Sequence, residues 1–242
     1  MLKLYGFSSS VYTRLVALVC KEKNIPYELI DVNLAKGDHK QPAFTANQPF
    51  AEVPYIDDEG FILYESRAIA RYLIKKYPNR GAPLIPTDPK AEALFEQAAS
   101  IEVSNFTAFI APIVAEKLFN PRLGLEPNEE RVKELLASLQ PKLDAYDLIL
   151  SKQKYLTGDH LSDIQSVTLA DLAHLPYGTF FYEVGFAEVF DSRPNFSRWW
   201  KDISNWPAWL ASQGCLMSSS QGKQELCYLC YVEDRAVDLE QN

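Results

Sequence analysis

The sequence predicts two domains, a small α/β domain at the N-terminus and an all-α domain over most of the remaining chain. Three observations lead to this prediction. Short strand-like segments alternate with longer helix-like segments over residues 1–80. The segment PNRGAPLIPTDP (78–89) holds four prolines and turn-forming residues, which is typical of a linker. Beyond this linker, apolar residues recur at helical spacing only.

The first three elements are predicted from their periodicity. MLKLYG (1–6) is a strand that ends at Gly6. VYTRLVALVCKEKN (11–24) places apolar residues on one face of a helix, which Asn24 ends. YELIDV (27–32) is a second strand. The order strand, helix, strand favours a parallel pair joined by a right-handed crossover.

The remaining elements complete the two domains. VPYIDD (53–58) and FILY (61–64) are short strands around a turn, and ESRAIARYLIKKY (65–77) is an amphipathic helix. We therefore expect a first domain over 1–80 and an all-helical domain over 91–210. The helices of the second domain are expected at 91–119, 129–153 and 168–184. Residues 211–242 lack clear periodicity, so their order is left uncertain.

The start of the helix after residue 162 has two possible signals. Thr168 and Asp171 have the spacing of a capping box, with Asp in place of the commoner Glu or Gln. Ser162 and Gln165 have the same form a few residues earlier. We predict that the helix begins at Thr168 and that residues 163–167 bulge out.

The composition narrows the classes of partner. The chain carries 24 basic and 32 acidic residues, a formal net charge of −8, whereas a nucleic-acid-binding face would need a basic patch. No apolar run approaches the roughly 20 residues of a membrane span, and Arg14 interrupts the apolar stretch that a signal peptide would need. Four cysteines are too few and too uneven for a disulfide framework, and CYLC (227–230) lacks a second pair of zinc ligands. We expect a cytoplasmic protein without metal, membrane or nucleic-acid partner.

The stretch GFSSSVYTR (6–14) raises a chemical question, because three serines lie between the first strand and the first helix. A serine before an apolar helix is most often an N-cap. The same place also gathers hydroxyl groups and free backbone N–H groups, which together stabilise an anion such as a thiolate. The residues alone leave both readings open.

Several motifs resemble, in order and spacing over residues 1–210, those of the cytosolic glutathione transferases. They are NQPFAEVPYID, LYESRAIARYL and GDHLS…TLADLAHLPY, while GDHK and RPNFSRWWKDIS are similar to the phi class. The resemblance implies a thioredoxin-like N-terminal domain, an all-α C-terminal domain and a homodimer. It further implies conjugation of the glutathione thiolate to small hydrophobic electrophiles, with glutathione peroxidase activity as a second expectation. Glutathione would be a co-substrate, and no cofactor is expected.

The resemblance also assigns the site residues. It places the catalytic hydroxyl four residues after Gly6, at Ser10, with Tyr5 and Tyr12 as the alternative hydroxyls. The residues expected to bind glutathione are His39 and Lys40 at the glycyl carboxylate, Glu52, Val53 and the cis residue Pro54 near the cysteinyl unit, and Glu65 and Ser66 at the γ-glutamyl end. Phi-class members usually have Gln where Glu52 stands, and a carboxylate there would repel the carboxylates of glutathione.

The second-substrate pocket is expected between the domains, lined by Val11, Leu34, Ala115 and Phe119. Two alternatives to a transferase remain. Glutathione-dependent thiol reductases on this fold need a cysteine at the start of the first helix, whereas Cys20 falls in its middle. A transferase-like carrier or regulatory protein that binds hydrophobic ligands is favoured by Glu52, by the extra residues 163–167 and by the unfamiliar C-terminal segment.

Overall fold

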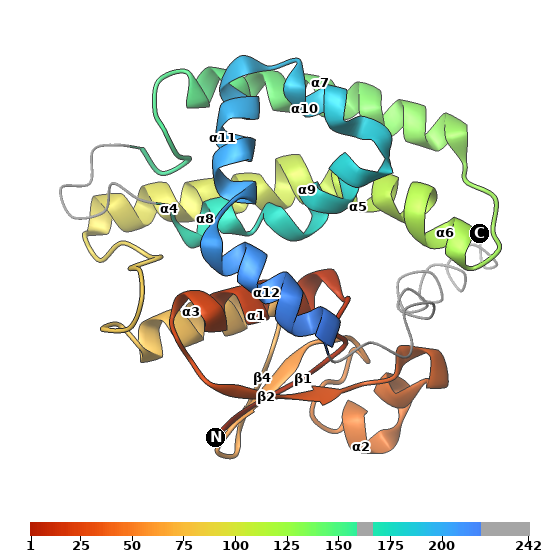
Figure 1. The fold of residues 1–242 in the computed structure, drawn as a ribbon, viewed down its shortest axis with the longest axis vertical. Coiled ribbons are helices and arrows are strands. Elements are labelled where there is room, and N and C mark those ends of the chain that lie inside the picture. Colours follow the sequence, from red (N-terminus) through yellow and green to blue (C-terminus); the bar gives the residue numbers. More distant parts are fainter. Residues whose placement is uncertain (159–166, 219–242) are drawn as a thin grey trace. The chain divides into compact units, whose positions relative to one another are not determined.

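The computed structural model describes residues 1–158 and 167–218, and these residues form two compact units. Unit 1 comprises Met1–Gly81, Arg122–Leu125 and the described residues from Ala208 onward. Unit 2 comprises Ala82–Pro121 and Glu126–Pro207. Figure 1 colours both units along the chain.

Unit 1 contains one four-stranded sheet with the order β2-β1-β3-β4. Strands β1 and β2 are parallel, whereas β3 is antiparallel to both β1 and β4. The parallel pair confirms the predicted strand–helix–strand crossover. The strands are β1 (Leu2–Gly6), β2 (Tyr27–Asp31), β3 (Tyr55–Asp58) and β4 (Phe61–Tyr64).

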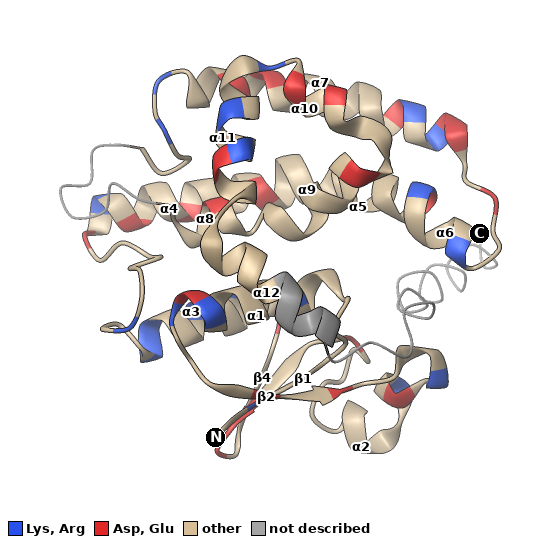
Figure 2. Ribbon diagram, viewed as in Figure 1, with Lys and Arg blue, Asp and Glu red and all other residues tan. Residues whose placement is uncertain are grey.

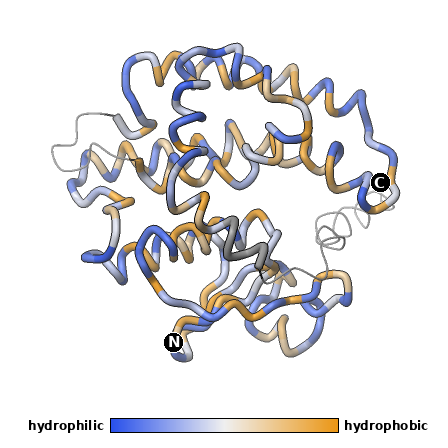
Figure 3. The backbone as a smooth tube through the Cα atoms, in the orientation of Figure 1, coloured by the Kyte–Doolittle hydropathy of each residue, from blue (hydrophilic) through white to orange (hydrophobic). Residues whose placement is uncertain are grey.

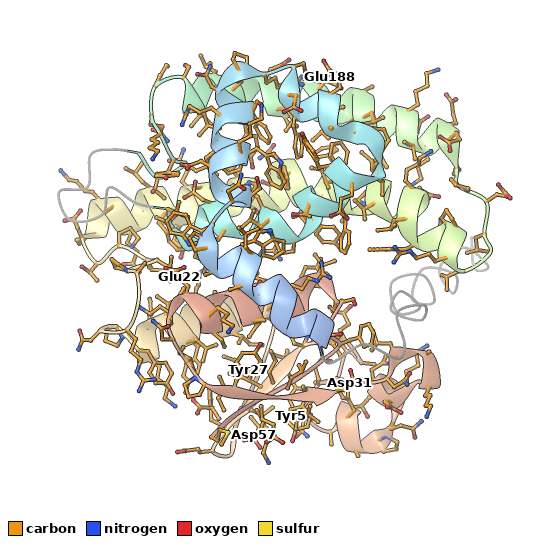
Figure 4. The ribbon with its side chains drawn as sticks, viewed as in Figure 1. Tyr5, Glu22, Tyr27, Asp31, Asp57 and Glu188 are labelled. Atoms are coloured by element: carbon orange, nitrogen blue, oxygen red, sulfur yellow. The ribbon has the colours of Figure 1, made fainter. Side chains whose placement is uncertain are left out.

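Helices cover both faces of this sheet. Helices α1 (Val11–Glu22) and α3 (Ser66–Lys76) pack against each other on one side, and the short α2 (Pro42–Thr45) lies on the other (Figure 1). Because strand side chains alternate between faces, Tyr5 points to the α2 side, where its ring stacks on Tyr55 at 4.4 Å (Figure 4). Tyr5 therefore belongs to the aromatic packing on the α2 side of the sheet.

Helix α1 ends two residues earlier than the sequence predicted. Asn24 adopts a left-handed conformation with φ 50°, its N–H donates to Lys21 O, and Ile25 N–H donates to Cys20 O at 2.8 Å. This pair of bonds is a Schellman motif, which satisfies the last carbonyl groups of a helix. Asn24 thus ends the helix from outside it, because asparagine tolerates the left-handed region.

Among its described residues, unit 2 consists of helices joined by turns and loops and contains no strand, as predicted. Helix α7 (Glu129–Leu150) buries Val132, Leu139, Leu143 and Tyr146 at helical spacing. Charged residues of both signs also lie along α7 (Figure 2), and apolar and polar residues alternate along this helix (Figure 3). The remaining helices are α4 (Pro89–Ile101), η3 (Glu102–Thr107), α5 (Ala108–Val114), η4 (Ala115–Phe119), α6 (Asn120–Arg122), α8 (Leu169–Leu172), α9 (Leu175–Phe181), η5 (Tyr182–Phe186), α10 (Ala187–Asp191) and α11 (Pro194–Ser204).

The continuous helix from Pro89 to Arg122 is more apolar than the sequence analysis allowed. An 18-residue window in it has a mean hydropathy of 1.4, enough by length and composition to cross a membrane. However, 44% of that window is buried inside the structure, and Phe106, Ile110 and Val114 are fully buried. We attribute its apolar character to its place at the core of unit 2, where it packs against α7 and α9.

Helix α8 begins where the capping-box spacing predicted. Thr168 is its N-cap, Asp171 accepts hydrogen bonds from the Thr168 N–H and hydroxyl, and the reciprocal capping-box bond is present. The predicted bulge is wrong at Val167, because the Val167 side chain is fully buried. An apolar side chain gains more from burial than from solvent, so the chain turns inward one residue before the cap. Residues 163–166 lie outside the described residues.

The segment without clear periodicity, 211–242, begins within a helix. Helix α12 (Pro207–Ser218) extends into it, and Trp209 and Ser212 are almost fully buried. The described residues from Ala208 onward are grouped with unit 1. The CYLC segment lies outside the described residues.

Candidate active site

The turn between β1 and α1 places Ser10 at the start of the helix. The Ser10 N–H donates to Phe7 O at 2.9 Å, and the Ser10 backbone is extended, with φ −65° and ψ 131°. Its Oγ accepts a long hydrogen bond of 3.4 Å from the Thr13 N–H. Ser10 is therefore the N-cap of α1, as a serine at this place most often is.

The capping bond leaves the Ser10 hydroxyl able to donate its own proton in a hydrogen bond. A hydroxyl has two acceptor lone pairs and one proton to donate. Here the cap uses an acceptor site, so the proton can be directed to a ligand. The side chain is half-buried, whereas Ser8 is almost fully buried. Helix α1 also contributes the positive end of its dipole and the N–H groups of its first turn. The arrangement suits a small anion beside Ser10.

The start of α3 forms a second polar position. Glu65 is its N-cap residue, with an exposed side chain and the unusual angles φ 68° and ψ 107°, and Ser66 is the first helical residue. The Glu65 side chain makes no capping bond to the start of α3. A non-glycine residue at positive φ costs of the order of 1–3 kcal/mol and is often kept at functional sites.

The loop before β3 contains the expected backbone feature. The Val53–Pro54 peptide bond is cis, as the resemblance implied. Val53 is half-buried, and Glu52 is exposed, with its N–H donating to Gln48 Oε1 at 3.3 Å. The Glu52 carboxylate therefore stands at the surface directly before the cis bond.

His39 and Lys40 are separated by their environments. Both lie in the short helix η2 (Asp38–Lys40), where His39 is only 3% exposed and Lys40 is exposed. The turn is held by hydrogen bonds from Asn33 N–H to Asp38 Oδ2 and from Lys36 N–H to Asn33 Oδ1, both at 3.1 Å. Of the pair, Lys40 presents its charge to solvent.

The four apolar candidates for a second-substrate pocket are all buried. In unit 1, Val11 is the first residue of α1, and Leu34 forms an apolar cluster with Val32, Phe44 and Tyr55. In unit 2, Ala115 and Phe119 lie in the π-helical segment η4. The Phe119 ring meets Phe180 edge-on at 6.2 Å. Leu34 and Phe119 therefore make contacts that a core residue makes.

Two contacts near Ser10 have no signal in the sequence. The Arg67 guanidinium lies 5.9 Å from the centre of the Tyr12 ring, which connects the starts of α3 and α1. The Thr13 side chain packs against Gly6 so closely that a Cβ atom on Gly6 would lie 2.6 Å from Thr13 Oγ1. The spacing of seven residues from strand to helix gives no warning of this contact, because it arises from the turn between them.

Cys20 has the environment of a structural cysteine. It is 1% exposed, and burial raises the pKa of its thiol to about 12. Reactive cysteines have a lowered pKa and are accessible, so Cys20 is the opposite of a redox nucleophile. In the part of the chain that the structure describes, no group of three or more His, Cys, Asp or Glu side chains could hold a metal ion.

Comparison with known proteins decides the family. Residues 4–81 match the family model for the glutathione S-transferase N-terminal domain, and residues 106–207 match that for the C-terminal domain. The chain belongs to the glutathione S-transferase family. Its fold is accordingly the thioredoxin-like sheet domain with a helical C-terminal domain that characterises this family.

Individual relatives agree with the phi-like assignment. The chain is 44% identical to glutathione S-transferase PM239X14 of Arabidopsis thaliana, over 82% of this chain and 89% of that protein. Glutathione transferase F7 from Populus trichocarpa superimposes with a TM-score of 0.83 at 35% identity, covering 89% of this chain and 99% of that one. Glutathione S-transferase I from mais, solved in complex with an atrazine glutathione conjugate, gives a TM-score of 0.80 at 30% identity, over 90% and 99%.

Proposed function

We propose that the chain conjugates the thiolate of glutathione to hydrophobic electrophiles, and that Ser10 is the catalytic residue. The observation that carries this proposal is the geometry of Ser10, whose Oγ accepts from the Thr13 N–H and so keeps its proton for a ligand. A glutathione thiol that loses its proton to solvent would receive that hydrogen bond as a thiolate. The thiolate sulfur then bonds to the electrophilic carbon while the bond to the leaving group breaks and that group departs to solvent, and catalysis rests on thiolate stabilisation and proximity.

The energy required is within reach of these groups. Lowering a thiol pKa from about 8.5 by about 2 units requires roughly 2.7 kcal/mol of preference for the thiolate. A hydrogen bond to a charged group contributes about 1.5–3 kcal/mol. The N-terminus of α1 adds about 0.3–1 kcal/mol. Together these contributions span about 1.8–4 kcal/mol, a range that includes the required preference for the thiolate.

The remaining groups match the ends of glutathione. Ser66 and the start of α3 suit the γ-glutamyl carboxylate, because the N-terminus of a helix binds anions and the Glu65 side chain does not cap it. Glu65, exposed beside it, suits the γ-glutamyl ammonium. Lys40 and, behind it, His39 are proposed at the glycyl carboxylate, and the Val53 backbone before the cis bond is proposed to pair with the cysteinyl unit. Glu52 is proposed to weaken binding, since its carboxylate repels those of glutathione.

The second substrate is proposed to be apolar, with Val11, Leu34, Ala115 and Phe119 as the residues that contact it. The atrazine conjugate bound by the mais relative supports an apolar electrophile as the substrate class. The same thiolate is proposed to reduce organic hydroperoxides as a second activity. We further propose a detoxifying, cytoplasmic homodimer.

A carrier or regulatory role is the second candidate, and Glu52 favours it. If Glu52 prevents glutathione from binding at cellular concentrations, the apolar residues would serve a hydrophobic ligand instead. The Glu52→Gln variant separates the two roles. A transferase weakened by Glu52 conjugates glutathione in the unmutated chain and faster in this variant, whereas a carrier gains glutathione affinity without conjugation and binds an apolar dye as before.

The decisive experiment compares glutathione conjugation to an activated aryl halide in the unmutated chain, in Ser10→Ala and in Ser9→Ala. We expect Ser10→Ala to lose most of kcat while still binding glutathione, because it removes the hydrogen bond to the thiolate. It also removes the N-cap of α1, and thermal unfolding measures that loss separately. Ser9→Ala is the matched control, a neighbouring serine outside the cap, and should keep its activity. An inactive unmutated protein, or equal losses in both variants, would contradict the proposed role of Ser10.

A further inference from the structure

Gly6 is the last residue of β1, and its lack of a side chain has a steric cause. A Cβ atom built at Gly6 would lie 2.6 Å from Thr13 Oγ1, 2.8 Å from Thr13 Cγ2 and 3.3 Å from Thr13 Cβ. Real Cβ atoms essentially never approach a neighbour below 3.0 Å. Gly6 is not among the glycines with positive φ. The residue is therefore glycine because the first turn of α1 rests directly on the end of β1.

Thr13 forms the other half of this contact. It is fully buried, and among the described residues its Oγ1 has no hydrogen-bond partner. A buried hydroxyl without a hydrogen-bond partner is unfavourable, so the hydroxyl does not explain why threonine stands here. We attribute the choice of threonine to its branched side chain, which covers Gly6. The Thr13 backbone N–H is also the donor that holds the Ser10 Oγ.

Three bonds connect this contact to the position of Ser10. The end of β1 is held to the following segment by Val32 N–H donating to Gly6 O at 3.0 Å. The turn is closed by Ser10 N–H donating to Phe7 O at 2.9 Å, and the helix begins with Arg14 N–H donating to Ser10 O at 2.9 Å. Both ends of the short turn are thus fixed. The separation between Gly6 and Thr13 then determines where the Ser10 hydroxyl stands.

We propose that Gly6 and Thr13 are a pair of positioning residues, whose contact holds the Ser10 hydroxyl at the height above the sheet at which it meets the glutathione thiol. This proposal rests on the proposed function. Neither residue touches the substrate, and both act through Ser10.

Gly6→Ala is the informative change. To bring the new Cβ to an ordinary contact distance, the start of α1 or the end of β1 must shift by most of an ångström. A misplacement of that size can cost about 100-fold in rate. We therefore expect kcat to fall by about 10- to 100-fold, the pKa of the bound thiol to rise, and the KM for glutathione to change less.

Two double variants separate positioning from general damage. Gly6→Ala with Thr13→Ala removes Oγ1 and Cγ2, which leaves only the 3.3 Å approach to Cβ. Gly6→Ala with Thr13→Val keeps a side chain of the same branched shape, so the clash persists. We expect the first to recover most of the kcat and the original pH–rate profile, and the second to recover neither.

The measurements are kcat, KM for glutathione, the pH dependence of kcat/KM and thermal unfolding, on all variants and the unmutated chain. Wild-type kcat in Gly6→Ala, or equal recovery with Thr13→Ala and Thr13→Val, would overturn the proposal. If Gly6→Ala alone does not fold, folding and activity restored by Thr13→Ala but not by Thr13→Val support it, and failure of both double variants overturns it. An inactive unmutated chain is a different result, since it removes the proposed function itself.

Discussion

Cys20 shows how burial decides the chemistry of a residue. It lies in the run Leu15–Cys20 of α1, every residue of which is buried. Transfer of a thiolate into such surroundings is unfavourable, and the pKa of the thiol is raised to about 12. The thiol reductase reading, which needs a reactive cysteine at the start of this helix, therefore has no support from Cys20.

We predict that Cys20 is protected from alkylation in the folded protein. At pH 8, iodoacetamide should leave Cys20 unlabelled in native protein and label it fully in denaturant, as read by peptide mass spectrometry. The reason is that the fraction of thiolate at pH 8 is negligible for a pKa of about 12. Rapid labelling of native Cys20 would show that α1 opens or that the thiol is ionised.

At the scale of single elements, α8 depends on one buried carboxylate. Asp171 accepts from the Leu156 N–H at 2.9 Å and from the Trp199 Nε1–H at 2.9 Å, in addition to its bonds with Thr168. Burial raises the pKa of Asp171, and these hydrogen bonds only partly offset that effect. The carboxylate thereby joins the start of α8 to α11 and to the segment after α7.

We predict that Asp171→Asn lowers the free energy of unfolding by about 2–4 kcal/mol. An amide oxygen can still accept from Leu156 and Trp199, but the amide NH₂ would face the Thr168 donors. Asp88→Asn is the matched control, because Asp88 is the N-cap of α4 near the surface and asparagine caps equally well. Urea unfolding of both variants tests this, and equal losses would contradict it.

Helix α3 and the sheet are joined by an ion pair between Lys76 of α3 and Asp58 of β3. Asp58, at the end of β3, accepts hydrogen bonds from the Tyr72 hydroxyl and the Lys76 ammonium. Burial acts to raise the pKa of Asp58, but these bonds outweigh it and hold the pKa below 3.8. Its folded pKa is thus lower than its unfolded pKa.

The sign of the pH dependence follows. Stability from Asp58 is fully present above its unfolded pKa of 3.8 and is lost as the pH falls through the lower folded pKa. We predict that Asp58→Asn lowers Tm at pH 7 and flattens the fall of Tm below pH 4. Calorimetry across pH 2–7 measures both effects. An acid limb as steep as that of the unmutated chain would show that other carboxylates control it.

At the scale of the whole molecule, two exposed aromatic rings of unit 1 are candidates for contacts in the proposed homodimer. Phe50 is 64% exposed in the loop before β3, with its ring edge-on to Tyr64 at 6.0 Å. Phe61, on β4, is 49% exposed. Aromatic side chains are enriched at protein interfaces, and Phe50 is the more exposed of these two rings, so it is the residue through which we test the proposed homodimer.

We predict that Phe50→Ser weakens self-association by at least about 10-fold, because burial of a large ring is a typical source of interface energy. Sedimentation equilibrium of the unmutated chain, Phe50→Ser and the control Phe61→Ser measures this. A monomer in the unmutated chain, or an equal effect of Phe61→Ser, would refute a role for Phe50 in a dimer.

The sequence by itself determined the architecture of this protein. Strand and helix periods predicted the four strands, α1, α3 and the helical stretches of unit 2 up to residue 184, but not α2, α10, α11 or α12. The capping-box spacing predicted the helix start at Thr168, and the motif order predicted the family. These features are local, since each depends on residues within one or two turns or strands. A serine before α1 was likewise predictable as a cap, and the family resemblance singled out Ser10 among three.

Only the tertiary structure decided how the residues around Ser10 are placed. It showed that the Ser10 hydroxyl caps α1 as a hydrogen-bond acceptor. It also showed that the Glu65 side chain does not cap α3, and that His39 is buried next to an exposed Lys40. It also turned Val167 inward and pressed Thr13 onto Gly6. Each of these outcomes depends on atoms that meet only after the chain has folded. The physical reason is steric: close packing fixes positions to within an ångström, and residue spacing carries no such information.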